Sequence, residues 1–222
     1  MFAGSKVSKP SMSFDRMRIR GASSLSSGPR SCMTRWFRWV DRLATVRTLA
    51  VLFALEVVLL GCVNAFDFPL SGPFMQRMTG HKYLDMCAFC SAPGIYTELD
   101  GFGNMGRQVQ LAMLLTIDIA IPLVSGLFGV VALSVLVKKE GFRWLIWVPI
   151  AAALLDYLEN AGIVTLLAAY PIHLTGVAAL TGWLTGVKFC AYSLTVLLTV
   201  GFALGRLRAA FWVSGPGQSG RI

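Results

Sequence analysis

Four long apolar stretches constrain the fold of this chain more than any other feature. They cover residues 48–66, 111–137, 144–172 and 174–205, and each is long enough to cross a bilayer, which takes about 20 helical residues. Charged residues make up only 14% of the 222 residues, whereas soluble domains carry about 25%. The sequence therefore predicts an all-α, integral membrane four-helix bundle, with no room for a separate catalytic domain.

The distribution of positive charge predicts the orientation of the bundle. Residues 1–47 carry ten Lys or Arg against two acids, which accounts for most of the net charge of +9. The segment 67–110 has three basic residues against four acids, 138–143 has three in six residues, and the turn at 170–173 has none. Because positive residues stay on the cytoplasmic side, we expect both termini to be cytoplasmic. The basic tail then serves as a topogenic signal, and we expect no nucleic-acid partner.

Composition assigns the regions outside the spans. We expect four regions: a basic, disordered N-terminal tail (1–40), the transmembrane bundle (41–208), its outer loop (67–110) and a C-terminal tail (209–222). The tail has two alternative interpretations, an organellar transit peptide or a misplaced start that precedes Met33. Nothing in it resembles a cleaved secretory signal. We expect the bacterial inner (plasma) membrane as the location, with an organellar inner membrane as the alternative.

Every predicted span contains an ionisable residue. A charge at the bilayer centre costs a few kcal/mol, so such residues face the bundle interior and pair. At a rise of about 1.5 Å per residue, they fall at depths that allow them to meet in one layer. Helical spacing gives the candidate polar site seven members: Glu56, Asp118, Asp156, Glu159, Asn160, Lys188 and Tyr192.

Residues three and four apart share one face of a helix, and this spacing puts polar stripes on three spans. In the third span Asp156, Glu159 and Asn160 lie at i, i+3 and i+4. The other two stripes are Asp118, Pro122, Ser125 and Gly129 in the second span, and Thr181, Thr185, Lys188, Tyr192, Thr195 and Thr199 in the fourth. Pro122 and Pro149 are expected to kink their helices. The pairs Gly182/Gly186 and Gly201/Gly205 predict close packing.

The balance of charge in the predicted layer has two interpretations. The residues could hold helices together by hydrogen bonds, with Lys188 paired to Asp156 or Glu159. The alternative is a polar site that binds a small molecule or relays protons. Four acids face one lysine, so one pair leaves three carboxyls that must be protonated, hydrated or bound to a cation. This imbalance favours a functional site, and we expect no cofactor.

The outer loop holds Cys87 and Cys90 in a CxxC motif. Its prolines and glycines predict no long helix, apart from a short interfacial turn at 95–99. The motif resembles that of quinone-linked disulfide-forming membrane proteins, but the second cysteine pair of that family is missing from the short turn at 170–173. A local disulfide, or a pair without a role, is the favoured interpretation. A metal site with His81 and Asp85 is weakly indicated, and we predict none.

Several short motifs over residues 40–205 resemble a group of small bacterial four-span membrane proteins that have no assigned activity. These are D-x3-P-x3-G at 118–126, D-Y-L-E-N at 156–160, a lone lysine at 188 in the last span, and L-D-G-F-G-N-M-G-R at 99–107. The resemblance implies the four-span fold and the choice of polar residues. It brings no activity with it.

Four hypotheses for function follow. The first is binding or transport of a small molecule or proton at the polar site, and the second is a membrane enzyme acting on a lipid-like substrate. The third is a dithiol redox protein, and the fourth is a structural or assembly subunit. The first is favoured, so the chain is not expected to be an enzyme. Expected partners are the lipid bilayer, a small-molecule ligand and, for transport, a second copy of the chain in a homo-oligomer.

Overall fold

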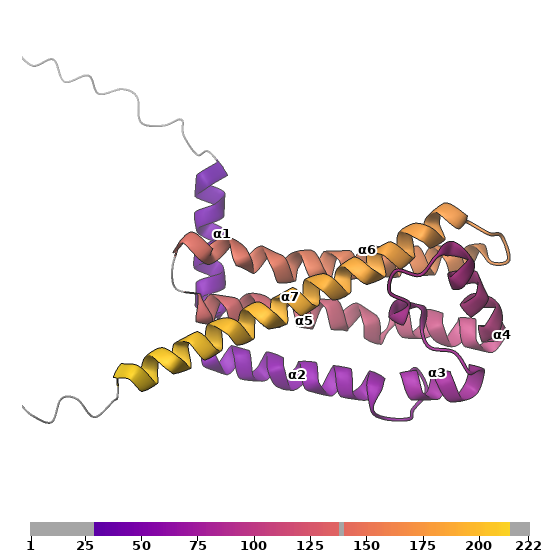
Figure 1. Cartoon of the computed structure of the whole chain (residues 1–222), viewed down its shortest axis with the longest axis horizontal. Helices are drawn as coiled ribbons and strands as arrows, with labels where there is room; N and C mark the ends of the chain where they lie inside the picture. Colours follow the sequence, from indigo (N-terminus) through magenta and orange to yellow (C-terminus); the bar gives the residue numbers. More distant parts are fainter. Residues whose placement is uncertain (1–28, 138–139, 214–222) are drawn as a thin grey trace, which may run out of the picture.

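The computed structural model describes residues 29–137 and 140–213, and this part of the chain contains helices and no strand (Figure 1). The seven α-helices are α1 (Pro29–Leu43), α2 (Val46–Asn64), α3 (Gly72–Thr79), α4 (Ala92–Leu115), α5 (Ile117–Leu136), α6 (Trp147–Ala169) and α7 (Thr175–Val213). Two 3-10 helices, η1 (Leu84–Met86) and η2 (Glu140–Ile146), lie between them.

Four of these helical segments are long and apolar enough to span a membrane. They are α2, α4 continued by α5, η2 continued by α6, and α7. The prediction of an all-α, integral membrane four-helix bundle is confirmed. The first and third spans begin and end within three residues of the predicted bounds. The second begins at Ala92 rather than at 111, and the helix of the last runs on to Val213. Most of α2 is exposed on the outside of the bundle, as expected of a helix in contact with lipid.

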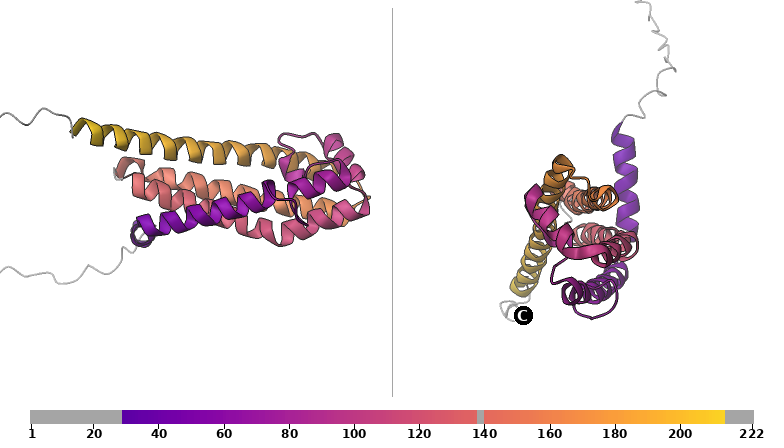
Figure 2. Two further views of the ribbon diagram at one scale, coloured as in Figure 1. Left: turned by 90° about the horizontal axis from the view of Figure 1, so that it is seen from below. Right: turned by 90° about the vertical axis from the view of Figure 1, so that its right-hand side faces the viewer.

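The beginning of α2 and the end of α7 lie at the same end of the bundle (Figures 1 and 2). An even number of crossings requires this arrangement. The basic residues of α1, η2 and the end of α7 gather at that end, called here the α1 end. That it faces the cytoplasm remains a prediction from the charge distribution.

Helix α1 lies across the bundle and almost perpendicular to it (Figures 1 and 2). Residues 1–28 of the expected tail fall outside the described residues, but 29–40 are helical, which corrects the expectation of a disordered tail up to residue 40. Pro29 opens the helix, the position where proline is best tolerated. Val40 is buried, and Trp36 stacks on Trp147 of α6 with ring centroids 6.3 Å apart.

The expectation that the outer loop holds no long helix is wrong. Pro73 and Pro93 occupy the first turns of α3 and α4, where no backbone hydrogen bond is lost. The hydroxyls of Ser71 and Ser91 accept hydrogen bonds from the backbone at the starts of α3 and α4, as N-caps do. Gly103, at φ 61° and ψ −174°, interrupts α4. Glycine thus divides α4 rather than preventing it, and residues 95–99 belong to its first half.

These outer helices form a cap with its own apolar core. Thirteen buried residues of α2, α3, η1, α4, α6 and α7 pack together there, among them Met75, Leu99 and Ile163. A smaller core lies near the α1 end, around Leu133 and Ile146. The buried polar residues of α5, α6 and α7 fall between these two cores along each helix.

Two predicted helix-shaping features act differently from expectation. Pro149 lies in the first turn of α6 and packs against Gly129 of α5, so it removes no backbone hydrogen bond. Among the described prolines, Pro122 of α5 is the one in the interior of a helix. Gly182 and Gly186 of α7 receive the loop that holds Cys87 and Cys90, not another helix. The Phe89 N–H donates to the Gly182 carbonyl at 2.8 Å.

This docking predicts the effect of alanine at two glycines of the same helix. A Cβ at Gly182 would collide with the backbone carbonyl of Cys90, whereas nothing lies within 4 Å of a Cβ at Gly205. We expect Gly182→Ala to cost about 1–3 kcal/mol of stability through overpacking. Gly205→Ala should match or exceed wild type, because alanine is the better helix former. Thermal unfolding of the detergent-purified proteins measures both, and equal melting temperatures would contradict the docking.

Candidate functional site

Lys188 of α7 lies at the centre of the candidate site and contacts two acids of α6. Its ammonium donates to Asp156 at 2.9 Å and also forms an ion pair with Glu159. All three side chains are almost completely buried, at 0–6% exposure. Asp156 and Glu159 lie three residues apart, so one face of α6 presents both to the same lysine.

Two hydroxyl groups of α7 complete the bonding of these acids. Thr185 donates to Glu159 at 2.6 Å, and Tyr192 donates to Asp156 at 3.0 Å. Both belong to the stripe that contains Lys188, with steps of three and four residues. Thus α7 faces α6 with a cation between two hydroxyl donors.

A second group lies beside this one, where α5 faces α6. The Asp118 carboxylate interacts with the Asn160 side chain and lies within electrostatic reach of Asp156 and Lys188. One oxygen of each side chain, Oδ2 of Asp118 and Oδ1 of Asn160, is buried without a hydrogen-bond partner among the described residues. Buried polar atoms are rarely left in this state.

Glu56 stands apart from Lys188. It accepts a 2.6 Å hydrogen bond from Ser125 of α5, so it links α2 to α5 and forms no described ion pair with the lysine. Its second oxygen is buried and unpaired in the described structure. Six of the seven predicted residues therefore lie where α6 contacts α5 and α7. Glu56 lies instead where α2 contacts α5.

The sequence analysis considered Asp85 of η1 only for a metal site and did not place it in the polar cluster. Asp85 is 6% exposed and interacts electrostatically with Lys188 and Asp156. Gln110 of α4 lies beside it, holding η1 in place by accepting the Leu84 N–H at 2.9 Å. Asp85 Oδ1 and Gln110 Nε2 both lack a hydrogen bond in the described structure. No periodicity could have identified Asp85, because it lies in an irregular loop.

The charges of the cluster do not balance. Asp85, Asp118, Asp156 and Glu159 are buried acids, and Lys188 is the only buried basic residue described among them. Burial raises the pKa of Asp85 above its ordinary value, and Lys188 opposes this only in part. Burial also raises the pKa of neighbouring Tyr83, with a further contribution from Asp85. A protonated Asp85 relieves part of the excess negative charge.

The cysteine motif lies next to this cluster. Cys87 and Cys90 form a disulfide, and the loop between them contacts α7 at Gly182 and Gly186, close in sequence to Lys188. His81 bonds Glu98 at 2.8 Å. No group of three or more His, Cys, Asp or Glu placed to hold a metal ion is found in the described part of the chain.

Comparison with protein-family models, with curated proteins and with solved structures finds no match for this chain.

The ion pairs predict the effect of removing the cation. Lys188→Met leaves Asp156 and Glu159 buried without a positive partner, so we expect a loss of about 3–5 kcal/mol. Neutralising the acids as well, in Lys188→Met with Asp156→Asn and Glu159→Gln, should recover most of it. Thermal unfolding in detergent measures this series, with exposed Lys82→Met as the control. A Lys188→Met variant as stable as wild type would contradict the pairing.

The raised pKa of Asp85 predicts a pH dependence of stability. Above its ordinary value near 3.8, the unfolded carboxyl loses its proton while the folded one retains it, so the free energy of unfolding falls as pH rises. Asp85→Asn should remove this contribution and stabilise the protein at neutral pH. Unfolding measured from pH 5 to 9 tests this, with exposed Asp100→Asn as control. An unchanged slope in Asp85→Asn would show that other groups set the dependence.

Proposed function

We propose that this multi-pass membrane protein binds a proton or a small cationic molecule at its intramembrane polar cluster. The observation that carries the proposal is the excess of buried carboxyls over buried cations among the described residues. An isolated buried carboxylate is costly, and it gains a proton or a counter-ion instead. The cluster therefore favours a positively charged occupant.

The unpaired oxygens indicate where such an occupant would bind. Asp156 and Glu159 are satisfied by Lys188, Thr185 and Tyr192. The acceptors left over in the described structure belong to Asp118, Asn160 and Asp85 and, at the contact of α2 with α5, to Glu56. A cation or proton at Asp118 would use acceptors that the protein leaves free, without breaking the bonds to Lys188.

The same pattern weakens the hypothesis of a purely structural layer. Polar residues that only join helices satisfy one another, and unsatisfied members make such a network worse than an apolar one. Asp156, Glu159 and Lys188 fit the structural role. The Asp118 carboxyl is buried, and its second oxygen has no hydrogen-bond partner in the described structure. Binding of a proton or a cation would explain why such a group lies there.

Binding and transport make different demands on the chain. Binding needs only the cluster and a route to it, whereas transport also needs a pore or alternating access. Four spans supply few helices for this, so transport through this site would involve a homo-oligomer. Our proposal is binding at the cluster, with transport as its extension in such an assembly.

Infrared difference spectroscopy of the protein in lipid nanodiscs tests the proposal. Raising the pH from 5 to 9 should bleach the carbonyl band of a protonated carboxylic acid, and Asp118→Asn should remove part of that signal. Exposed Asp100→Asn is the matched control and should leave the band unchanged. A melting-temperature screen with ammonium and guanidinium compounds tests the cationic ligand by mass action. Asp118→Asn spectra identical to wild type, with no stabilising cation, would overturn the proposal.

A further inference from the structure

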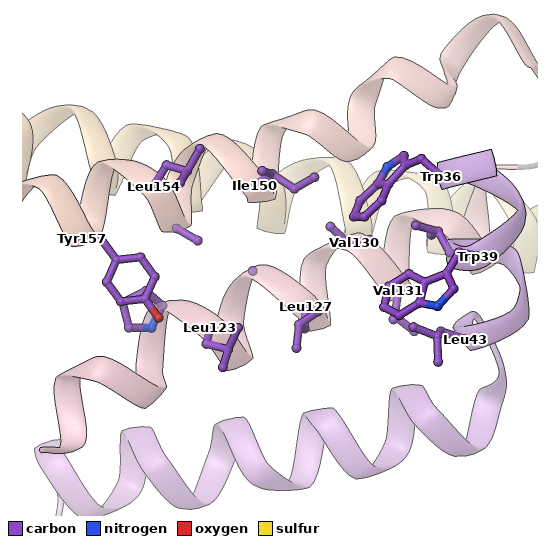
Figure 3. A pocket seen from close by; sticks show the side chains of 14 residues that line it. Trp36, Trp39, Leu43, Leu123, Leu127, Val130, Val131, Ile150, Leu154 and Tyr157 are labelled. Carbon is purple, nitrogen blue, oxygen red and sulfur yellow. The ribbon is translucent and has the colours of Figure 1, made fainter. Parts of the chain in front are cut away.

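An apolar groove opens between α1, α5 and α6 on the side of the bundle (Figure 3). Its volume is about 170 Å³. Tyr157 closes the groove at one end. Its hydroxyl, the only one in the lining, donates a hydrogen bond to the Ile119 carbonyl at 2.7 Å. Leu123, Leu127 and Leu154 form exposed rims. This lateral groove is separate from the polar cluster and makes no use of it.

The groove exists because small residues lie at the contact of α5 and α6. Gly126 and Ala153 line its floor, and a Cβ on Gly126 would come within 2.9 Å of the Ala153 Cβ. The backbones of α5 and α6 therefore lie close together at the floor of the groove, and leucine side chains form its two walls. At about 1.5 Å per residue, the α6 lining from Ile150 to Tyr157 is about 10 Å long.

Helix α1 closes the other end of the lateral groove. Trp36, Trp39, Val40 and Leu43 line it, and their spacing puts all four on one face of α1. A helix that carries tryptophans and arginines and lies across the end of a bundle is placed at the level of lipid headgroups. The groove thus runs from the headgroup region of one leaflet into its acyl chains.

The chain that follows the α1 lining of the groove is positively charged. Arg42 directly precedes Leu43 of the lining, and Arg47 lies in the first turn of α2; both are exposed. The one acid of described α1, Asp41, is paired with Arg143 at 2.7 Å. Nothing acidic in this stretch therefore neutralises Arg42 and Arg47, and an anion is the complementary ligand.

We propose that the lateral groove holds part of one acyl chain of an anionic phospholipid, taken from the leaflet at the α1 end, with the phosphate held by Arg42 and Arg47. The groove supplies the apolar contact and the arginines supply the charge. The proposal is independent of the function proposed for the polar cluster.

Tryptophan quenching by brominated lipids tests this site directly, since Trp36 and Trp39 line it. The full chain is reconstituted in phosphatidylcholine vesicles that contain a small fraction of lipid brominated on its acyl chain, either phosphatidylglycerol or phosphatidylcholine. At about 1 kcal/mol for each arginine, we expect phosphatidylglycerol to bind about 10- to 30-fold better. Equal quenching by the two lipids would overturn the proposal.

Two pairs of matched variants locate the lipid. Arg42→Gln with Arg47→Gln should bring the preference close to 1, whereas Arg206→Gln with Arg208→Gln, which removes the same charge from α7, should keep it. Ala153→Phe fills the groove and should abolish the extra quenching, while Ala151→Phe on the exposed face of α6 should not. Equal losses in both arginine pairs, or full quenching in Ala153→Phe, would overturn the site. If Ala153→Phe fails to fold, the arginine pairs still decide.

Discussion

The buried contact of Lys188 with Asp156 and Glu159 determines how α7, the longest described helix, is aligned on α6. A cation in the membrane interior must have its acids in place, so α7 can slide or rotate against α6 only by losing that pairing. Thr185 and Tyr192 donate to the same acids from one turn on either side. The rest of the bundle is arranged around this alignment, with α5 adding Asp118 from the side.

The cap depends on the same contact. The loop that bears the disulfide packs on glycines of α7 just before Lys188, and η1 brings Asp85 within electrostatic reach of the lysine. The turn between α6 and α7 is also tied to α4, since the Leu174 N–H donates to the Tyr96 hydroxyl at 2.5 Å. The extramembrane and intramembrane parts of the chain therefore form one structure.

Periodicity and length predicted the spans and most of the polar cluster, because a membrane helix needs about 20 apolar residues and a buried charge must face inward. They failed where structure depends on contacts distant in the sequence. Pro73 and Pro93 suggested breaks, yet each follows a serine N-cap and opens a helix. Asp85 lies in no repeating pattern, and only the folding of η1 against Gln110 brings it to the cluster. Gly182 and Gly186 indicated that another segment packs closely on α7, but the sequence did not show that this segment is the loop with Cys87 and Cys90.

Helix α7 is continuous over 39 residues, which at 1.5 Å per residue makes a rod about 58 Å long, nearly twice the roughly 30 Å of a hydrocarbon core. Its last turns extend beyond the other helices at the α1 end (Figure 2). It contains no proline, the residue that most sharply kinks a helix, and it is continuous from the α6–α7 turn to the α1 end. A force applied to the end of α7 outside the bilayer would therefore be transmitted along the helix to Lys188, which lies about a third of the way along it.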